Sequence, residues 1–159
     1  MEIEASIARL GLVLPAAPRL PTDVRGSFAW TRTHGDRVYV SGHSAQAPDG
    51  TLAGPFGKVP GEVSLEDAID AARQTALSVL ANLRRELGDL DRITGWLMIH
   101  GMVNADAGYD RTPTVINGFS DLILDLFGNE CGRHARTAAG VAALPANNAV
   151  VIGAEVAFV

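Results

Sequence analysis

Residues 64–103 read SLEDAIDAARQTALSVLANLRRELGDLDRITGWLMIHGMV, and this stretch decides the fold. Its first part predicts a helix over residues 64–87. Ser64 and Asp67 form a capping-box pattern at the start of this helix, and Gly88 stops it. The apolar positions recur at helical spacing and form one stripe, which comprises Leu65, Ala68, Ile69, Ala72, Ala76, Val79, Leu80, Leu83 and Leu87.

The second part of this stretch predicts a buried strand directly after the helix. Residues 93–103 are nearly uncharged and hold several large apolar side chains in a row, a pattern typical of a covered strand. A second helix is expected over residues 114–127, because apolar residues recur there at helical spacing and Gly128 follows.

Upstream of this unit, the sequence predicts a β-hairpin. Residues 27–33 and 37–41 are two short β-rich runs, and the glycine of His34-Gly35-Asp36 between them supplies the positive φ of a tight turn. Residues 43–61 hold four glycines and three prolines among polar residues, too many breakers for a regular element. We therefore expect a long surface loop there.

Two further strands are expected at the end of the chain, over residues 137–144 and 149–159, with a turn at residues 145–148. The element order is then ββαβαββ, which predicts an α+β fold with a two-layer arrangement, a mixed sheet and two helices packed on one face. The other apolar face of the sheet needs a cover. Because another copy of the chain is the simplest cover, we expect an oligomer.

The N-terminal part is expected to form a lead-in to this domain. Residues 2–10 have helical spacing, and three prolines keep residues 13–25 extended and exposed. We therefore divide the chain into residues 1–23, a helix and an extended lead-in, and residues 24–159, one domain. The acidic start does not fit a signal peptide.

The composition is typical of a compact globular protein with little affinity for nucleic acid. Hydrophobic residues make up 47%, charged residues 19%, and the net charge is −5. The 13 basic residues against 18 acids are scattered and form no patch for phosphate backbones. Cys131 is the single cysteine, which favours a cytoplasmic location. No metal, nucleotide or membrane-spanning motif occurs, so we expect no cofactor, no metal and no membrane contact.

Two ionisable side chains stand out in the apolar C-terminal strands, Arg136 and Glu155. An arginine there reaches solvent, pairs with a carboxylate, or lines a cleft where a ligand supplies the negative charge. A solvated strand end and a pair with Glu155 therefore stay open as alternatives. Cys131 is a conceivable nucleophile, although Glu130 beside it opposes ionisation of the thiol. His100, on the predicted strand, is expected to be a core residue.

Three short motifs occur at defined places in this pattern. They are Val40-Ser41-Gly42 after the hairpin, Val115-Ile116-Asn117-Gly118 on the second helix, and His134-Ala135-Arg136-Thr137 leading into Val141-Ala142-Ala143-Leu144-Pro145. Together they resemble the RidA/YjgF (endoribonuclease L-PSP) family over residues 24–159. His134 stands where the best-known branch has a proline, and in this respect the chain is similar to a separate branch, the YjgF-like endoribonucleases.

The resemblance implies a chorismate-mutase-like fold and a homotrimer, with three sheets around a central barrel and a cleft at each subunit interface. It also implies hydrolysis of enamines or imines to a 2-keto acid and ammonia. By this resemblance Arg136 holds the carboxylate of a small substrate, Ser41 with Gly42 forms the hairpin side of the cleft, and Asn117 lies on the helix side. A guanidinium suits that role because it donates two parallel charge-assisted hydrogen bonds to a carboxylate.

The chain departs from the family pattern at the residue that would activate the water molecule for hydrolysis. The family's strand glutamate aligns with Gly153, and the aromatic hydroxyl of the first strand becomes Phe28, which still falls in the substrate cleft. His100, His134 or Glu155 could supply the acid or base instead.

Three functions are therefore compatible with the sequence. The first is an enamine or imine deaminase-like hydrolase that acts on small 2-imino carboxylates. The second is a non-catalytic metabolite-binding trimer, which the glycine at position 153 and Phe28 favour. The third is an endoribonuclease, which the family label suggests and the net charge of −5 opposes.

Overall fold

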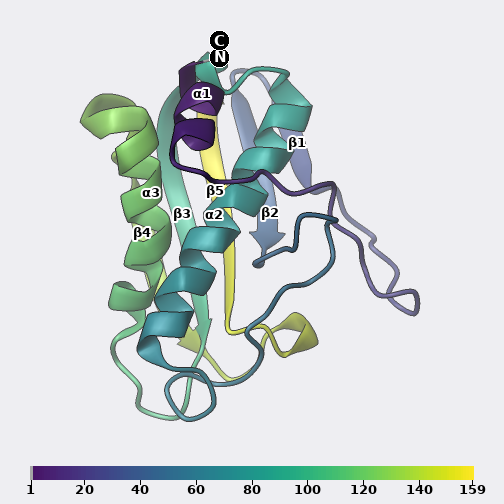
Figure 1. The fold of residues 1–159 in the computed structure, drawn as a ribbon, viewed down its shortest axis with the longest axis vertical. Helices are drawn as coiled ribbons and strands as arrows, with labels where there is room; N and C mark the ends of the chain where they lie inside the picture. The colour runs from purple at the N-terminus through teal and green to yellow at the C-terminus, as the bar shows by residue number, and fades with distance from the viewer. Residues whose placement is uncertain (1) are drawn as a thin grey trace.

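The computed structural model of the protein describes residues 2–159. Met1, the first residue of the predicted N-terminal segment, lies outside the described residues. The main helices and strands are α1 (Glu2–Arg9), β1 (Thr31–His34), β2 (Arg37–His43), α2 (Leu65–Leu87), β3 (Ile93–Asn104), α3 (Thr112–Gly132), β4 (Ala135–Val141) and β5 (Val150–Phe158) (Figure 1). Short 3-10 turns occur at Leu90–Arg92 and Pro145–Asn147.

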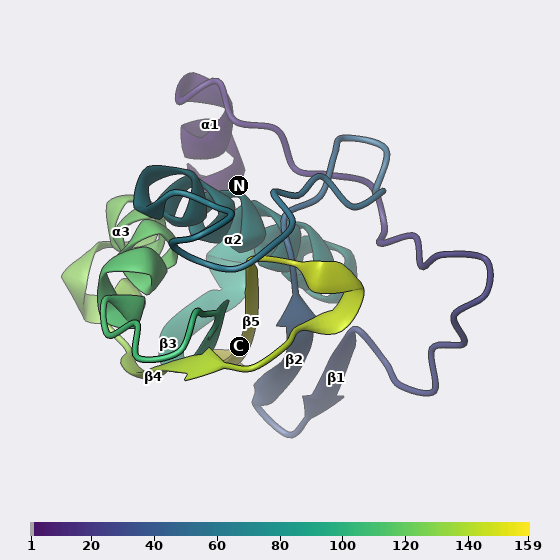
Figure 2. The same ribbon diagram turned by 90° about the horizontal axis from the view of Figure 1, so that it is seen from below.

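The strands form one mixed sheet in the order β1-β2-β5-β3-β4. β3 runs parallel to β4 and antiparallel to β5, and the β1–β2 hairpin extends the sheet on the other side of β5. α2 and α3 pack side by side on one face of the sheet (Figure 2). These features confirm the predicted two-layer α+β fold and its ββαβαββ order.

α2 forms where the sequence predicts it, because its ends are capped by local hydrogen bonds. The hydroxyl of Ser64 accepts from the backbone N–H of Asp67 at 3.1 Å. At the other end Gly88 has a φ of 82°, and its N–H donates to the carbonyl of Arg84.

α3 is longer than predicted at both ends. It begins at Thr112 with Pro113 in its first turn, a position that suits proline. Gly128 has a φ of 70°, so the regular helix stops there as expected, but another helical turn follows and continues to Gly132. This extra turn places residues 133–136 directly beside the middle of α3, where the candidate site lies.

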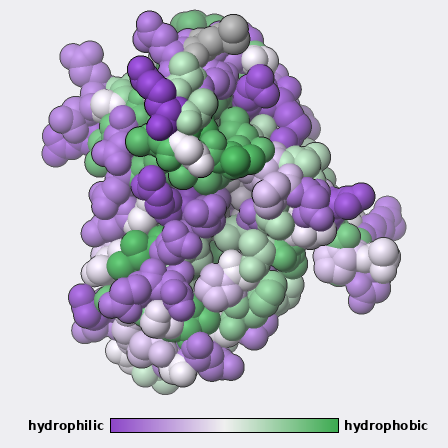
Figure 3. All heavy atoms as spheres, in the orientation of Figure 1, coloured by the Kyte–Doolittle hydropathy of each residue, from purple (hydrophilic) through white to green (hydrophobic). Residues whose placement is uncertain are grey.

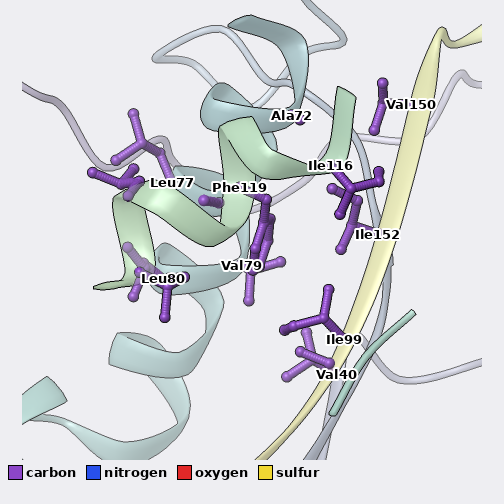
Figure 4. Close-up of a cluster of buried hydrophobic side chains, with 14 of the residues drawn as sticks. Val40, Ala72, Leu77, Val79, Leu80, Ile99, Ile116, Phe119, Val150 and Ile152 are labelled. Carbon is purple, nitrogen blue, oxygen red and sulfur yellow. The ribbon is translucent and has the colours of Figure 1, made fainter. Parts of the chain in front are cut away.

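The core lies between the helices and the sheet. Figure 4 shows side chains of α2 and α3, such as Leu80 and Phe119, facing side chains of β3 and β5, such as Ile99 and Ile152. The two helices approach closely at Gly118, where an added Cβ would lie 2.1 Å from the carbonyl oxygen of Ile69. Apolar burial of this extent provides the main driving force for the fold. The outer, helix side of the molecule presents a mixture of hydrophilic and hydrophobic residues (Figure 3).

The second face of the sheet is not covered by any described part of the chain. Ile99 and Val103 point toward the helices, so the alternation of a strand places Met98, His100 and Met102 on the opposite face. The prediction of His100 as a core residue is therefore wrong. Its side chain is 49% exposed, because a strand with helices on one side has only alternate residues buried.

Apart from His43, the last residue of β2, residues 43–61 have no regular element, as predicted, but they are not a surface loop throughout. Ala45 and Val59 are buried, and Val59 pairs with Ala105 in an isolated parallel bridge. Phe56 forms another bridge with Asn148. The glycines and prolines prevent a helix or strand here, yet the apolar residues between them still pack against the end of the sheet.

The lead-in, which we define as residues 13–25, crosses from α1 to the hairpin. Two backbone hydrogen bonds attach its first half to the domain. The N–H of Ala16 donates to the carbonyl oxygen of Pro48, and the N–H of Arg19 donates to the carbonyl oxygen of Gly50. Its second half runs outward past β1 before it returns (Figure 2). Among residues 2–159, no helix has the length and apolar character that a membrane crossing requires.

Candidate functional site

Arg136 lies in β4, opposite Ile99 of β3, and its side chain reaches the middle of α3. Its Nη1 donates to the hydroxyl oxygen of Ser120 at 3.0 Å, and its Nη2 donates to the carbonyl of Pro113 at 3.3 Å. Neither partner carries a charge. The alternative of a pair with Glu155 is wrong, because Glu155 contacts His100 instead, with Nε2 and Oε1 3.8 Å apart.

His134 continues this arrangement into a short chain of hydrogen bonds. Its Nδ1 lies 2.7 Å from the carbonyl oxygen of Gly132, and its Nε2 lies 2.8 Å from the hydroxyl of Ser120. A carbonyl only accepts, so Nδ1 carries the proton and Nε2 accepts from Ser120. The Ser120 hydroxyl thus accepts from Arg136 and donates to His134.

The environment keeps His134 neutral. Burial lowers the pKa of its ring, and the positive charge of Arg136 acts in the same direction, whereas the hydrogen bond to Gly132 raises the pKa to a smaller extent than burial lowers it. A neutral imidazole with Nε2 as an acceptor can take a proton. The structure therefore brings one of the three predicted acid or base candidates into the neighbourhood of Arg136.

These residues line a pocket of about 230 Å³ between α3 and β4, which we call the Arg136 pocket. Its lining comprises Asn117, Ser120, Asp121, Leu124, Arg133, His134 and Arg136. Three of the residues singled out in the sequence, Asn117, His134 and Arg136, are thus brought together. Ser120 and Asp121 were missed. The only local signal for them is their spacing from Asn117, which places Ser120 and Asp121 on the same side of the helix.

A second group of predicted site residues lies near the β1–β2 hairpin, at the edge of the sheet opposite β4. It comprises Phe28, Ser41 and Gly42. The Ser41 hydroxyl donates to the carbonyl of Ala29 at 2.6 Å. Phe28 is 53% exposed and contacts Trp30 edge-on, with ring centroids 4.8 Å apart. The prediction that Phe28 lies in the first strand is wrong, because β1 begins only at Thr31. Since β5 and β3 separate β2 from β4, one chain does not join this group to Arg136.

A cavity of about 150 Å³ adjoins this second group, and we call it the lead-in cavity. It lies between the lead-in and the ends of β2 and β5, and Gly42 is part of its lining. The lining further comprises Pro18, Arg19, Leu20, Pro21, Val24, Trp30, His43, Ser44, Gln46, Gly50, Leu52, Pro145, Ala146, Asn148 and Val151. The sequence alone does not indicate this cavity, because its walls come from segments far apart in the chain.

His43, in the wall of this cavity, is a buried neutral histidine. Its Nδ1 donates to the carbonyl of Ser41, and its Nε2 accepts from the side-chain amide of Asn82, both at 2.6 Å. Burial is the main cause that lowers its pKa from 6.5 to about 4. Both ring nitrogens are therefore occupied, and the ring stays uncharged at neutral pH.

We expect this buried ring to make the stability of the protein pH-dependent. The free energy of unfolding should decrease by about 2 kcal/mol between pH 7 and about pH 5, because unfolded His43 takes up a proton in this window and folded His43 does not. Urea unfolding of the protein and of His43→Gln at both pH values measures this. A variant that loses as much stability as the unmodified protein between the two pH values would contradict the expectation.

Cys131 does not have the environment of a nucleophile. Its Sγ lies 3.4 Å from the carbonyl oxygen of Ile93, and burial raises the pKa of the thiol. The thiol form thus prevails at neutral pH, and thiolate chemistry is disfavoured.

Comparisons with known proteins agree with this fold and extend over nearly the whole chain. A family described as "YjgF/chorismate mutase-like, putative endoribonuclease" matches residues 26–156. Protein TCP17 of Trypanosoma cruzi is 37% identical over 155 residues, which is 97% of this chain and 92% of that protein. The crystal structure of the protein Atu1372 from Agrobacterium tumefaciens is 33% identical, has a TM-score of 0.86, and matches over 99% of this chain and 92% of that one.

A more distant structure supports the fold alone. The crystal structure of E. coli TdcF with bound serine is 16% identical, with a TM-score of 0.62, and the match covers 92% of this chain and 98% of that chain. The family match over residues 26–156 includes every residue that lines the Arg136 pocket, and the two relatives of more than 30% identity extend over nearly the whole chain. On this evidence, the chain belongs to the YjgF/chorismate mutase-like family.

Proposed function

We propose that the protein is a homotrimer that binds small 2-keto and 2-imino carboxylates in clefts between its protomers and hydrolyses the imines. The observation that carries this proposal is the state of Arg136. Arg136 is half-buried, and the hydrogen-bond partners of its guanidinium in residues 2–159 are the neutral oxygens of Ser120 and Pro113. Because neutral acceptors leave the positive charge uncompensated, the Arg136 pocket favours an anionic ligand.

The clefts are proposed to be shared because each protomer holds only half of the expected residues in one place. Arg136 and Asn117 line one pocket, whereas Ser41 and Gly42 lie two strands away. The uncovered face of the sheet supports an assembly, since Met98 and Met102 lie on it and would be shielded by another copy. In the trimer, Arg136 of one protomer would meet Ser41, Gly42 and Phe28 of its neighbour.

The chemistry of imine hydrolysis requires a proton carrier beside the bound carboxylate. Water adds to the imine carbon and gives a proton to a base, the nitrogen receives a proton, and the C–N bond breaks to release ammonia and the 2-keto acid. His134 is suited to this role because its Nε2 is unprotonated and it lies in the same pocket as Arg136. His100 and Glu155 are less suited, because they contact each other on the uncovered face.

A metabolite-binding protein without catalysis is the second candidate, and Gly153 favours it. This glycine is buried, and an added Cβ would lie 3.1 Å from the carbonyl oxygen of Val40, so the position has little room for an acidic side chain. If no other group takes over the proton transfer, binding persists while turnover is lost.

An endoribonuclease is disfavoured by charge. The net charge of −5 repels a phosphate backbone. A filter-binding assay with a single-stranded RNA at low salt tests this, because phosphate contacts are strongest there. Tight binding that weakens with added salt would favour the ribonuclease over the hydrolase.

One pair of measurements separates the hydrolase from the binder. The first is the rate at which the protein removes 2-iminopropionate, produced in the cuvette by an amino-acid oxidase, relative to buffer alone. The second is the shift of the melting temperature by pyruvate, the stable 2-keto acid product that keeps the carboxylate of the substrate. The hydrolase predicts both signals and the binder predicts the second alone. If neither signal appears, the proposed function is wrong.

A further inference from the structure

The lead-in cavity has walls that are almost entirely apolar. Leu20 and Val24 of the lead-in face Trp30, Leu52 and Val151 of the domain across it. An apolar cavity of about 150 Å³ is large enough to hold a benzene ring. The cavity therefore has the size and the character of a site for one branched aliphatic or aromatic group.

The polar groups of the cavity wall do not favour a charged group. The ring of His43 is neutral and both its nitrogens are hydrogen-bonded, and the side-chain amide of Asn148 donates to the carbonyl of Pro145. The lining contains no Asp or Glu, so a cationic group would find no carboxylate there, although the side-chain oxygen of Gln46 in the lining is a buried acceptor without a hydrogen-bond partner among residues 2–159. The single charged residue of the lining, Arg19, is exposed and leaves the interior apolar.

The outer wall is built by a segment that the family match does not include. The match begins at residue 26, whereas Leu20 and Val24 precede it. The backbone of the lead-in lies directly against the domain, because an added Cβ at Gly50 would lie 2.1 Å from the carbonyl oxygen of Ala17. The first half of the lead-in is thus held against the domain, and Leu20 and Val24 follow it in the chain. The cavity wall also accounts for Leu20 and Val24, which are apolar residues that are 37% and 49% exposed.

The position of the cavity connects it to the proposed cleft. Gly42 belongs to both, and Trp30 lines the cavity and also contacts Phe28. A ligand whose carboxylate is held by Arg136 of the neighbouring protomer would therefore have the apolar cavity beside it. Resting on the proposed function, we propose that the lead-in cavity receives the side chain of the substrate and selects 2-keto and 2-imino carboxylates with a bulky apolar side chain.

The test measures the dissociation constants of three 2-keto acids that differ in their side chains: pyruvate, 4-methyl-2-oxopentanoate and phenylpyruvate. Isothermal titration with the full chain is expected to give affinities for the two bulky acids that are about tenfold to a hundredfold higher than the affinity for pyruvate, since burial of a Leu- or Phe-sized group provides a gain of this order. The double variant Leu20→Gln, Val24→Gln is expected to remove most of this preference. Leu10→Gln is the matched control, because Leu10 is 53% exposed and is not part of the cavity wall.

The outcomes distinguish this inference from the proposed function. If none of the three acids binds, the proposed function is wrong and the inference falls with it. If all three bind with equal affinity and Arg136→Ala abolishes binding, the carboxylate site stands and the side-chain pocket is overturned. A preference for bulky acids that the double variant leaves unchanged would also overturn it, because the selection would then arise elsewhere.

Discussion

Arg136→Ala is expected to reduce kcat/KM for 2-iminopropionate by at least about a hundredfold, because it removes two charge-assisted hydrogen bonds of about 1.5–3 kcal/mol each to the carboxylate. Arg136→Lys should recover only part of this loss, since an ammonium group cannot reproduce the planar pair of donors. Arg136→Ala should also abolish the shift of the melting temperature by pyruvate, and Arg136→Lys should reduce it. Initial rates in the coupled imine assay, together with thermal unfolding, measure these effects.

Arg111→Ala is the control for the loss of one positive charge near the site. Arg111 is exposed at the start of α3 and is not part of the pocket lining. Its replacement is expected to change kcat/KM by less than about threefold, as is usual for an exposed charge. If Arg136→Ala kept the full rate and the pyruvate shift, the carboxylate would be held by another residue.

His134→Gln is expected to reduce kcat by about a hundredfold or more while pyruvate still binds, because a general base contributes about 10²–10⁴-fold in rate. The pH dependence of the activity should also have a definite direction. The lowered pKa of His134 means that the ring remains an acceptor at neutral pH, and activity should decline as the pH falls through that lowered pKa. The variant should lack this acid limb. Measurements of kcat/KM against pH for both proteins test the assignment.

Ser120→Ala helps to separate the effect of the base from that of its position. The Ser120 hydroxyl is hydrogen-bonded to both Arg136 and His134, and its removal leaves both side chains present while breaking the chain of hydrogen bonds between them. We expect a smaller loss of kcat than with His134→Gln and a shifted acid limb. An unchanged rate and profile in His134→Gln would contradict the assignment and would point to Asp121, the other titratable group that could act as a base in the pocket.

The sequence predicts the fold where its signals are local. The capping residue Ser64, the apolar stripe of α2 and the stop at Gly88 are all read within one segment, and the structure has α2 at Leu65–Leu87. The strand that follows was predicted with similar accuracy, but its two faces were not distinguished. His100 was therefore placed in the core, whereas the structure places it on the uncovered face.

The candidate site was predicted only in part, because its geometry depends on contacts between distant segments. Arg136 stood out as a charged residue in an apolar strand, and Asn117 was found through the resemblance to the family. The structure places both in one pocket. The link through Ser120 could not be predicted, since no pattern in the sequence places residues 120 and 136 within hydrogen-bond distance. The lead-in cavity was missed for the same reason, because residues 18–24 meet β2 and β5 only in the folded chain.

The central claim is that each site takes Arg136 from one protomer and the hairpin residues from another, and a mixing experiment tests it. Arg136→Ala and Gly42→Leu disable the two halves separately, because a side chain at Gly42 would meet Val151 at the mouth of the lead-in cavity. Each variant alone should be inactive. Refolding the two together in equal amounts should restore about a quarter of the activity, since each half of a cleft is intact with a probability of about one half. Mixed protein that remains as inactive as the separate variants would contradict a site shared between protomers.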